Sequence, residues 1–126
     1  MSAPFIYING IPFPPPKMGM SYTVTTTVDS SRNANAQVIG NKVGRDQIKL
    51  DNLEWPILDA HTWGKALREF RKFKLDVKYY DPVEEKFITR KFYPGDRSFI
   101  LHKVDKNTGI PLEYRECKCN LIDMGY

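Results

Sequence analysis

Alternation of hydrophobic and polar residues runs through most of the chain and predicts a mainly β protein. In residues 21–29, Tyr22, Val24 and Val28 fall on one face of an extended segment, with serine and threonines between them. Alternation with a period of two and a high content of β-branched residues are typical of a strand. The same reasoning predicts strands at residues 5–8, 37–43, 47–55, 75–80, 86–93, 98–104 and 112–122. A bulge is expected at Asp51-Asn52, Pro56 is expected to end the strand 47–55, and the strands after the helix are expected to form a meander.

One helix is predicted, at residues 60–73. Trp63, Leu67 and Phe70 recur at helical spacing, and Asp59 is suited to cap the exposed amides of the first turn. This apolar stripe fits either packing against the chain's own sheet or docking in a partner's groove, and we expect the former. Short strands separated by turns, with one helix among them, indicate an antiparallel β-sandwich or one strongly curled sheet.

A single domain of residues 1–126 is predicted, in three parts. Residues 1–20 give a short strand and a proline-rich arm, in which Pro14, Pro15 and Pro16 lack amide donors. The arm can cover an edge of its own sheet or lie on a neighbouring subunit. Residues 21–46 form a long hairpin too poor in large apolar groups to pack on a core, and residues 47–126 form the body.

Composition excludes some classes of protein without naming one. Of 126 residues, 41% are hydrophobic and 27% are charged, which are ordinary values for a globular domain. No apolar run is long enough to span a bilayer and the N-terminus has no signal-peptide pattern, so we expect a cytoplasmic product. Nineteen basic against fifteen acidic residues give a net charge of +4, which permits an anionic partner.

Catalytic and metal-binding patterns are absent from the sequence, and we expect neither an enzyme nor a cofactor. No phosphate-binding glycine loop, HExxH, CxxC or GxSxG motif occurs. Ser98 and His102 would lie roughly 13 Å apart on one strand, too far for a catalytic pair. Cys117 and Cys119 share one face of a strand and are expected to be buried free thiols.

Basic residues suggest one alternative function, a nucleic-acid-binding module. Lys65, Arg68, Arg71, Lys72 and Lys74 form either the solvated face of the helix or a phosphate-binding stripe. Aromatic and basic residues also alternate in residues 86–93, a composition that base stacking requires. The residues assigned to this alternative are Arg68, Arg71, Arg90 and Lys91.

The segment 93–98 combines Pro94, Gly95, Asp96 and Arg97, residues that favour a tight turn. The guanidinium of Arg97 is a planar donor that could also reach a carboxylate on an adjacent copy.

The order of the elements resembles that of a known class of protein. The residues that carry this resemblance are Ile8-Asn9-Gly10, Arg32, Gly40, Gly44, Leu53-Glu54-Trp55-Pro56, Leu58, Trp63 and Tyr93-Pro94-Gly95-Asp96-Arg97. They are similar to small prophage proteins encoded among the tail genes of phages of Gram-positive bacteria. The layout also resembles the tail-tube-like domain of tube proteins and of the N-terminal part of distal tail proteins.

This resemblance implies a β-sandwich with one flanking helix, packed side by side in a ring, commonly sixfold, around the tail channel. The protein would be a structural subunit of a phage tail or tail-tip (baseplate) assembly, built in the host cytoplasm and present in the virion tail. Its partners would be its own copies and other tail proteins, with DNA only as passing cargo and no membrane or small-molecule substrate. The residues expected at subunit contacts are Arg32, Asn33, Asn35, Gln37, Ile39, Pro14, Pro15, Pro16 and Arg97.

Overall fold

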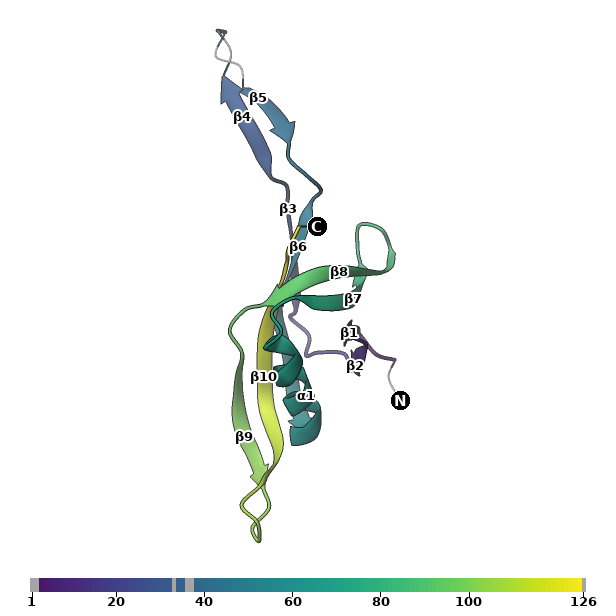
Figure 1. Ribbon diagram of the computed structural model, residues 1–126, viewed down its shortest axis with the longest axis vertical. Helices are drawn as coiled ribbons and strands as arrows, with labels where there is room; N and C mark the ends of the chain where they lie inside the picture. Colours follow the sequence, from purple (N-terminus) through teal and green to yellow (C-terminus); the bar gives the residue numbers. More distant parts are fainter. Residues whose placement is uncertain (1–2, 33, 36–37, 126) are drawn as a thin grey trace.

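The computed structural model describes residues 3–32, 34–35 and 38–125, and it shows a mainly β protein with one helix. Figure 1 shows an elongated molecule with a hairpin at each end of its long axis. The elements are β1 (Ile6–Ile8), β2 (Ile11–Phe13), β3 (Ser21–Thr25), β4 (Val28–Arg32), β5 (Val38–Lys42), β6 (Gln47–Asp59), α1 (Ala60–Phe70), β7 (Leu75–Asp81), β8 (Lys86–Pro94), β9 (Ser98–Val104) and β10 (Pro111–Asp123).

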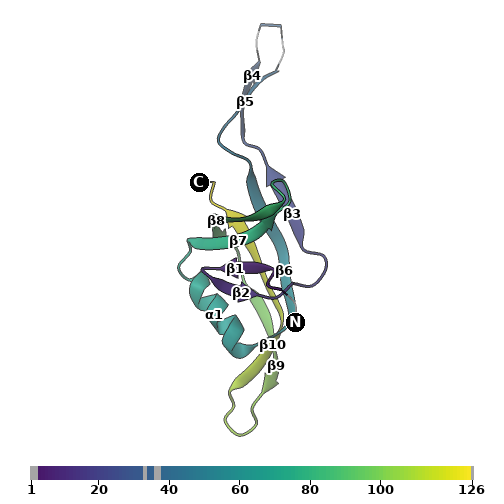
Figure 2. The ribbon, with the colours of Figure 1, turned by 90° about the vertical axis from the view of Figure 1, so that its right-hand side faces the viewer.

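Eight of these strands form one antiparallel sheet in the order β2-β1-β7-β8-β10-β6-β3, with β9 also paired to β10. The sheet curls, so that β1, β2 and β7 cross in front of β6 and β10, and α1 lies on this same face (Figure 2). Of the two arrangements that the sequence leaves open, the described strands adopt the single curled sheet.

The longest pairing joins β6 and β10, which have thirteen residues each. Their register runs from Glu113 opposite Asp59 to Ile122 opposite Lys49, with an irregularity between Cys119 and Leu121. Asn52 has a φ of 58°, which confirms the bulge expected at residues 51–52. A bulge increases local twist, and this one helps the sheet to curl over its buried face.

The core lies inside this curl. The indole of Trp55, from β6, contacts the ring of Trp63 on α1 with 6.3 Å between centroids, and both side chains are buried. The larger fully buried side chains are Trp55, Trp63, Tyr79, Phe13, Phe70, Phe92, Ile6, Ile8, Leu50, Leu53, Leu75 and Leu121. The helical stripe therefore packs on the chain's own sheet, as expected.

The helix begins as predicted and ends earlier. The Asp59 carboxylate accepts hydrogen bonds from the Thr62 amide at 3.0 Å and from the Thr62 hydroxyl at 2.6 Å. The helix ends at Phe70 and not at residue 73. The reason is that Phe73 has a φ of 68°, a left-handed conformation that no helical residue has.

Two other predictions about the body are wrong. Pro56 does not end its strand. Among the described strands, β3 pairs only with residues 47–51 of β6, so β10 is the one strand paired with β6 near Pro56, and the missing amide breaks no ladder. The last strands also do not form a meander. The link at residues 95–97 carries the chain from β8 to β9, and both strands pair with β10 and not with each other.

The predicted hairpin at residues 21–46 is divided into two parts. The expected continuous strand at residues 21–29 breaks after Thr25, and β3 pairs with β6, from Ser21 opposite Asp51 to Thr25 opposite Gln47. The strands β4 and β5 then pair with each other, apart from the large sheet. Figure 1 shows this outer pair extending well beyond the body.

The arm lies against its own sheet. The amide of Lys17 donates to the carbonyl of Glu54 at 2.7 Å, and the indole N–H of Trp55 donates to the carbonyl of Pro14 at 2.7 Å. The arm thus covers the edge of β6 below β3, which is one of the two placements that the sequence allows.

The N-cap of α1 gives the first testable prediction. Replacing Asp59 by alanine removes both acceptors of Thr62, so the free energy of unfolding should fall by about 1 kcal/mol in urea denaturation. The control is Lys65→Ala at an exposed helix position, which should change stability by less than about 0.5 kcal/mol. Equal stability of the Asp59→Ala variant and the wild type would contradict the cap.

Candidate assembly surfaces

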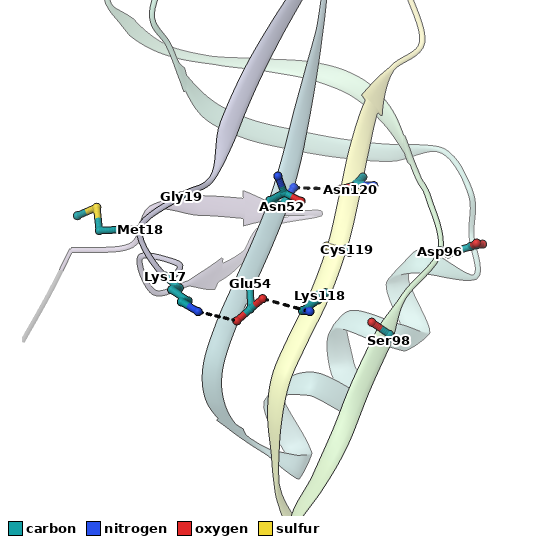
Figure 3. A pocket seen from close by; sticks show the side chains of 10 residues that line it. All are labelled: Lys17, Met18, Gly19, Asn52, Glu54, Asp96, Ser98, Lys118, Cys119 and Asn120. Atoms are coloured by element: carbon teal, nitrogen blue, oxygen red, sulfur yellow. Dashed lines mark hydrogen bonds and ion pairs between the residues drawn. The ribbon is translucent and has the colours of Figure 1, made fainter.

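A row of four residues crosses the outer face of the sheet from one edge to the other. Ser98 on β9 lies opposite Lys118 on β10, which lies opposite Glu54 on β6. Glu54 in turn receives the backbone bond from Lys17 in the arm. The edge strand β9 and the arm therefore lie at the same height on opposite sides of the sheet, as Figure 3 shows.

A polar depression of about 340 Å³ follows this row. The Glu54 carboxylate bridges the ammonium groups of Lys17 and Lys118, at 3.6 and 3.5 Å, and the Asn120 side chain accepts from the Asn52 amide at 3.0 Å. Glu54 thus links both lysines of the depression (Figure 3). An open hollow with paired charges is suited to polar contact with another protein surface more than to a reaction.

One edge of the sheet is the strand β9, which pairs only with β10 among the described strands. All seven of its residues are exposed. Ile100 and Leu101 are 42% and 53% exposed, and Val104 is 37% exposed. Sheet edges in monomeric proteins are normally guarded by charge, proline or bulges. This edge has Lys103 and three irregularities in its pairing with β10, and it still exposes several apolar side chains.

The opposite edge carries an apolar groove of about 240 Å³ formed by the arm and the start of β3. Phe5, Pro15, Pro16, Met20 and Tyr22 line it together with Met18. The side chain of Met18 is 95% exposed, and a flexible thioether chain adapts readily to a partner surface. The two edges of the sheet thus both present apolar side chains.

The root of the projecting hairpin is held by a buried carboxylate. The Arg45 guanidinium donates to both oxygens of Asp123, at 2.6 and 2.5 Å, and the amides of Ile48 and Gly125 donate to the same group. Arg45 lies between β5 and β6, and Asp123 ends β10. This clamp fixes the end of the hairpin to the last strand of the body.

Two opposing influences set the pKa of the Asp123 carboxyl. Burial raises the pKa, but the hydrogen bonds from Arg45, Gly125 and Ile48 and the charge of Arg45 outweigh burial and hold the pKa below its usual value. Hydrogen bonds to the ionised form stabilise that form. The clamp is therefore strongest when Asp123 is ionised.

The residues expected at subunit contacts are distributed over three places. Arg32 ends β4 and Ile39 lies in β5, both in the projecting pair, and Asn35 lies in the turn between these strands. Asn33 and Gln37 lie outside the described residues. Pro14, Pro15 and Pro16 lie in the arm against β6, where Pro15 and Pro16 line the groove.

The structure gives Arg97 an intramolecular position. Its guanidinium donates to the carbonyl of Gly95 at 3.2 Å and lies 5.9 Å from the ring centre of Phe70. The side chain is directed to its own helix.

The four residues of the nucleic-acid alternative do not form one surface. Arg68 and Arg71 lie at the end of α1, whereas Arg90 and Lys91 are adjacent in β8 and therefore point to opposite faces of the strand. Lys91 is ion-paired with Asp76 at 2.5 Å, and Arg90 lines a cavity with Tyr79 and Asp81. Burial raises the pKa of Tyr79 to about 12.

Groups capable of catalysis are dispersed or unreactive in the described part of the chain. Asp96 and Ser98 line the polar depression, while His102 lines a different one. Cys117 and Cys119 are buried and free, as expected, and burial raises their thiol pKa values to about 11 and about 12. Within residues 3–32, 34–35 and 38–125, no cluster of three or more His, Cys, Asp or Glu side chains could hold a metal ion.

A search for membrane spans among the described residues finds no helix of sufficient length and apolarity to cross a bilayer. No family model, curated protein or solved structure shows a significant match to the chain.

Sequence reasoning found some of these surfaces and missed others. Proline content identified the arm, and low apolar content identified the hairpin. The exposed edge at β9 was missed because its alternating Phe99 and Leu101 have the pattern of a core strand. The Arg45–Asp123 clamp joins residues 78 positions apart, and no local signal indicates such a pair.

The clamp predicts a pH-dependent loss of stability. Arg45→Met should lower the free energy of unfolding at pH 7 by roughly 1.5–3 kcal/mol, the range for hydrogen bonds to charged groups. The pKa of Asp123 is lower in the folded protein than in the unfolded chain, so the clamp stabilises fully above the unfolded value of about 3.9. That stabilisation is lost as the pH falls through the folded pKa.

Urea denaturation of wild type and variant between pH 7 and pH 3 measures this effect. The difference between them should shrink below about pH 4, where Asp123 becomes protonated. Arg97→Met is the control, because Arg97 contacts a ring and a carbonyl and no carboxylate. A difference for Arg45→Met that stays constant over this range would show that the ion pair is not its source.

Proposed function

We propose that this protein is a structural subunit of a bacteriophage tail or tail-tip assembly, which acts by forming a ring of identical copies, commonly six. In this proposal the curled sheet and its helix serve as the sandwich-like body of a tail-tube-like domain. The projecting hairpin reaches the next subunit or ring, other tail proteins are the further partners, and DNA passes only as cargo.

One observation carries the proposal: exposed apolar side chains flank the row Ser98–Lys118–Glu54–Lys17 on both sides of the sheet, those of β9 on one side and those of the arm groove on the other. If copies are related by rotation about an axis along the strands, β9 of one copy faces the arm and β6 of the next. Such a head-to-tail contact uses two different surfaces of the same chain and closes into a ring.

Strand direction is compatible with this arrangement. The strand β9 is antiparallel to β10, which is antiparallel to β6, so β9 and β6 run in the same direction, and β3 runs opposite to both. Rotation about an axis along the strands preserves these directions. The strand β9 is level with β6 from Glu54 toward Asp59, whereas β3 is level with residues 47–51, so in this ring β9 meets the arm and this part of β6 in the next copy.

The projecting hairpin also supports an assembly function. Its two strands pair with each other alone, so an isolated subunit holds it out in solvent without a packing surface. The Arg45–Asp123 clamp nevertheless keeps its root in a fixed position. A rigidly mounted projection gains stability when a neighbouring molecule covers it, which fits a role in contact between subunits.

The edge contact gives a direct test of the proposal. Leu101→Asp on β9 and Met18→Asp in the arm each place a charge on one of the apolar surfaces. Light scattering across a hundredfold concentration range should show a closed oligomer for the wild type and monomers for both variants. Ile110→Asp is the matched control, since Ile110 is 59% exposed in the β9–β10 turn and should leave the oligomer intact.

Monomeric wild-type protein at every concentration would refute the ring, and so would variants that assemble as well as the wild type. Adding a DNA oligonucleotide at low salt tests the alternative function. A mass that rises only with DNA, with affinity falling steeply as salt increases, would favour the nucleic-acid-binding module.

Shortening the hairpin gives a second prediction. Residues 29–41 can be replaced by Asn-Gly, because Val28 and Lys42 are directly paired and this dipeptide favours a two-residue turn. The shortened protein should keep its circular dichroism spectrum and its denaturation midpoint but lose assembly. Loss of folding would instead show that the hairpin is part of the core.

A further inference from the structure

Basic and acidic side chains lie at opposite ends of the strand β7. The basic end of α1, with Arg68 and Arg71, is followed directly by β7 at Leu75. The other end of β7 enters the turn that contains Glu84 and Glu85. Seven residues of extended chain span about 23 Å, so the two charged groups lie on opposite sides of the molecule.

The fold places these groups beside the two edges of the sheet. The helix lies next to β9, because Trp63 contacts the ring of Phe99 with 5.9 Å between centroids. The β7–β8 turn lies next to β3, because Glu84 and Val24 line one cavity. Figure 2 shows β7 crossing the view from the side of α1 to the side of β3, at a steep angle to the long axis.

The basic group is only partly neutralised, because Glu69 interacts with the charges of Lys72 and Arg68. Lys72 is ion-paired with Glu69 at 2.7 Å, but no salt bridge within the described residues engages Arg68 or Arg71. Arg68 and Arg71 are three residues apart and repel each other, while Glu69 and the C-terminal end of the helix dipole offset part of their charge. Glu84 and Glu85 are adjacent, exposed and likewise without a salt bridge in the described part.

The acidic turn is held in an ordered conformation. The Asp81 side chain accepts from the amides of Val83 and Glu84, at 2.8 and 3.2 Å, and the Asp81 carbonyl accepts from the amide of Glu85 at 2.8 Å. Two glutamates on a fixed turn present their charge at lower entropic cost than residues in a mobile loop would.

We propose that the basic end of α1 in one copy binds the acidic β7–β8 turn of the next copy. The proposal rests on the ring described above, because the edge that carries β9 then meets the edge that carries β3. Charge complementarity selects a second copy as the partner, since one chain bears both halves of the contact on opposite sides. The contact fixes the orientation and the alignment of neighbouring copies at a junction whose other surfaces are apolar.

Charge reversal tests this contact. Arg68→Glu/Arg71→Glu and Glu84→Lys/Glu85→Lys each replace attraction by repulsion at the junction, and each should weaken association about tenfold or more at low salt. The chain that carries all four substitutions restores opposite charges and should recover assembly. Light scattering and sedimentation at low and high salt measure both effects.

Mixing the two double variants provides an independent test of the head-to-tail geometry. Each reversed surface then finds its opposite only on the other variant, so assemblies of alternating chains with an even number of copies should form. A further control compares Lys106→Glu, in the β9–β10 turn, with the single variant Arg71→Glu. Both lower the net charge by two, and only Arg71→Glu should weaken association.

The outcomes separate this contact from the ring itself. Wild-type monomers would refute both proposals. A wild-type ring that persists in both double variants, or a fourfold variant no better than either double variant, would refute only the charge contact. Two results together would overturn the proposal: DNA binding that is lost in Arg68→Glu/Arg71→Glu, and self-association that these substitutions leave unchanged. They would assign the basic end to phosphate recognition.

Discussion

The antiparallel pairing of β6 with β10 is the interaction on which the rest of the molecule depends. These two strands of thirteen residues connect β3 on one side with β8 and β9 on the other. The helix begins where β6 ends, because Asp59 is both the last residue of the strand and the cap of α1. With one short helix to cover a long sheet, the chain must bend its remaining strands over the same face to enclose a core.

That bending leaves the outer face of the sheet and the edge at β9 without cover, while the arm covers part of the opposite edge. The buried side chains all serve one interior, while the polar depression, the apolar edge at β9 and the arm groove lie on the remaining surface. A small domain that buries one face of its sheet has surface available for neighbours. The features that favour an assembly function therefore follow from how the core is built.

Local sequence patterns predicted the elements better than their partners. Alternation located most strands, and the spacing of Trp63, Leu67 and Phe70 located the helix. Pairing depends on contacts between distant residues, so the order in which β8 and β9 join β10 could not be read from either strand. Pro56 shows the same limit, since its effect depends on whether a neighbouring strand needs its amide. At the assembly surfaces, composition identified the arm and hairpin, but the charge separation along β7 required the fold.

Most segments of a domain must both pair with its sheet and stay attached to its body. In the β4–β5 hairpin these two requirements are separate. Its residues have no large-sheet partner to match, while the paired positions Val28 and Lys42 and the ion pair at the root define how any insert is mounted. The sequence of the hairpin can therefore vary while its attachment to the body stays the same. Another two-stranded segment grafted between these positions would change the projection and leave the body that carries it unaltered.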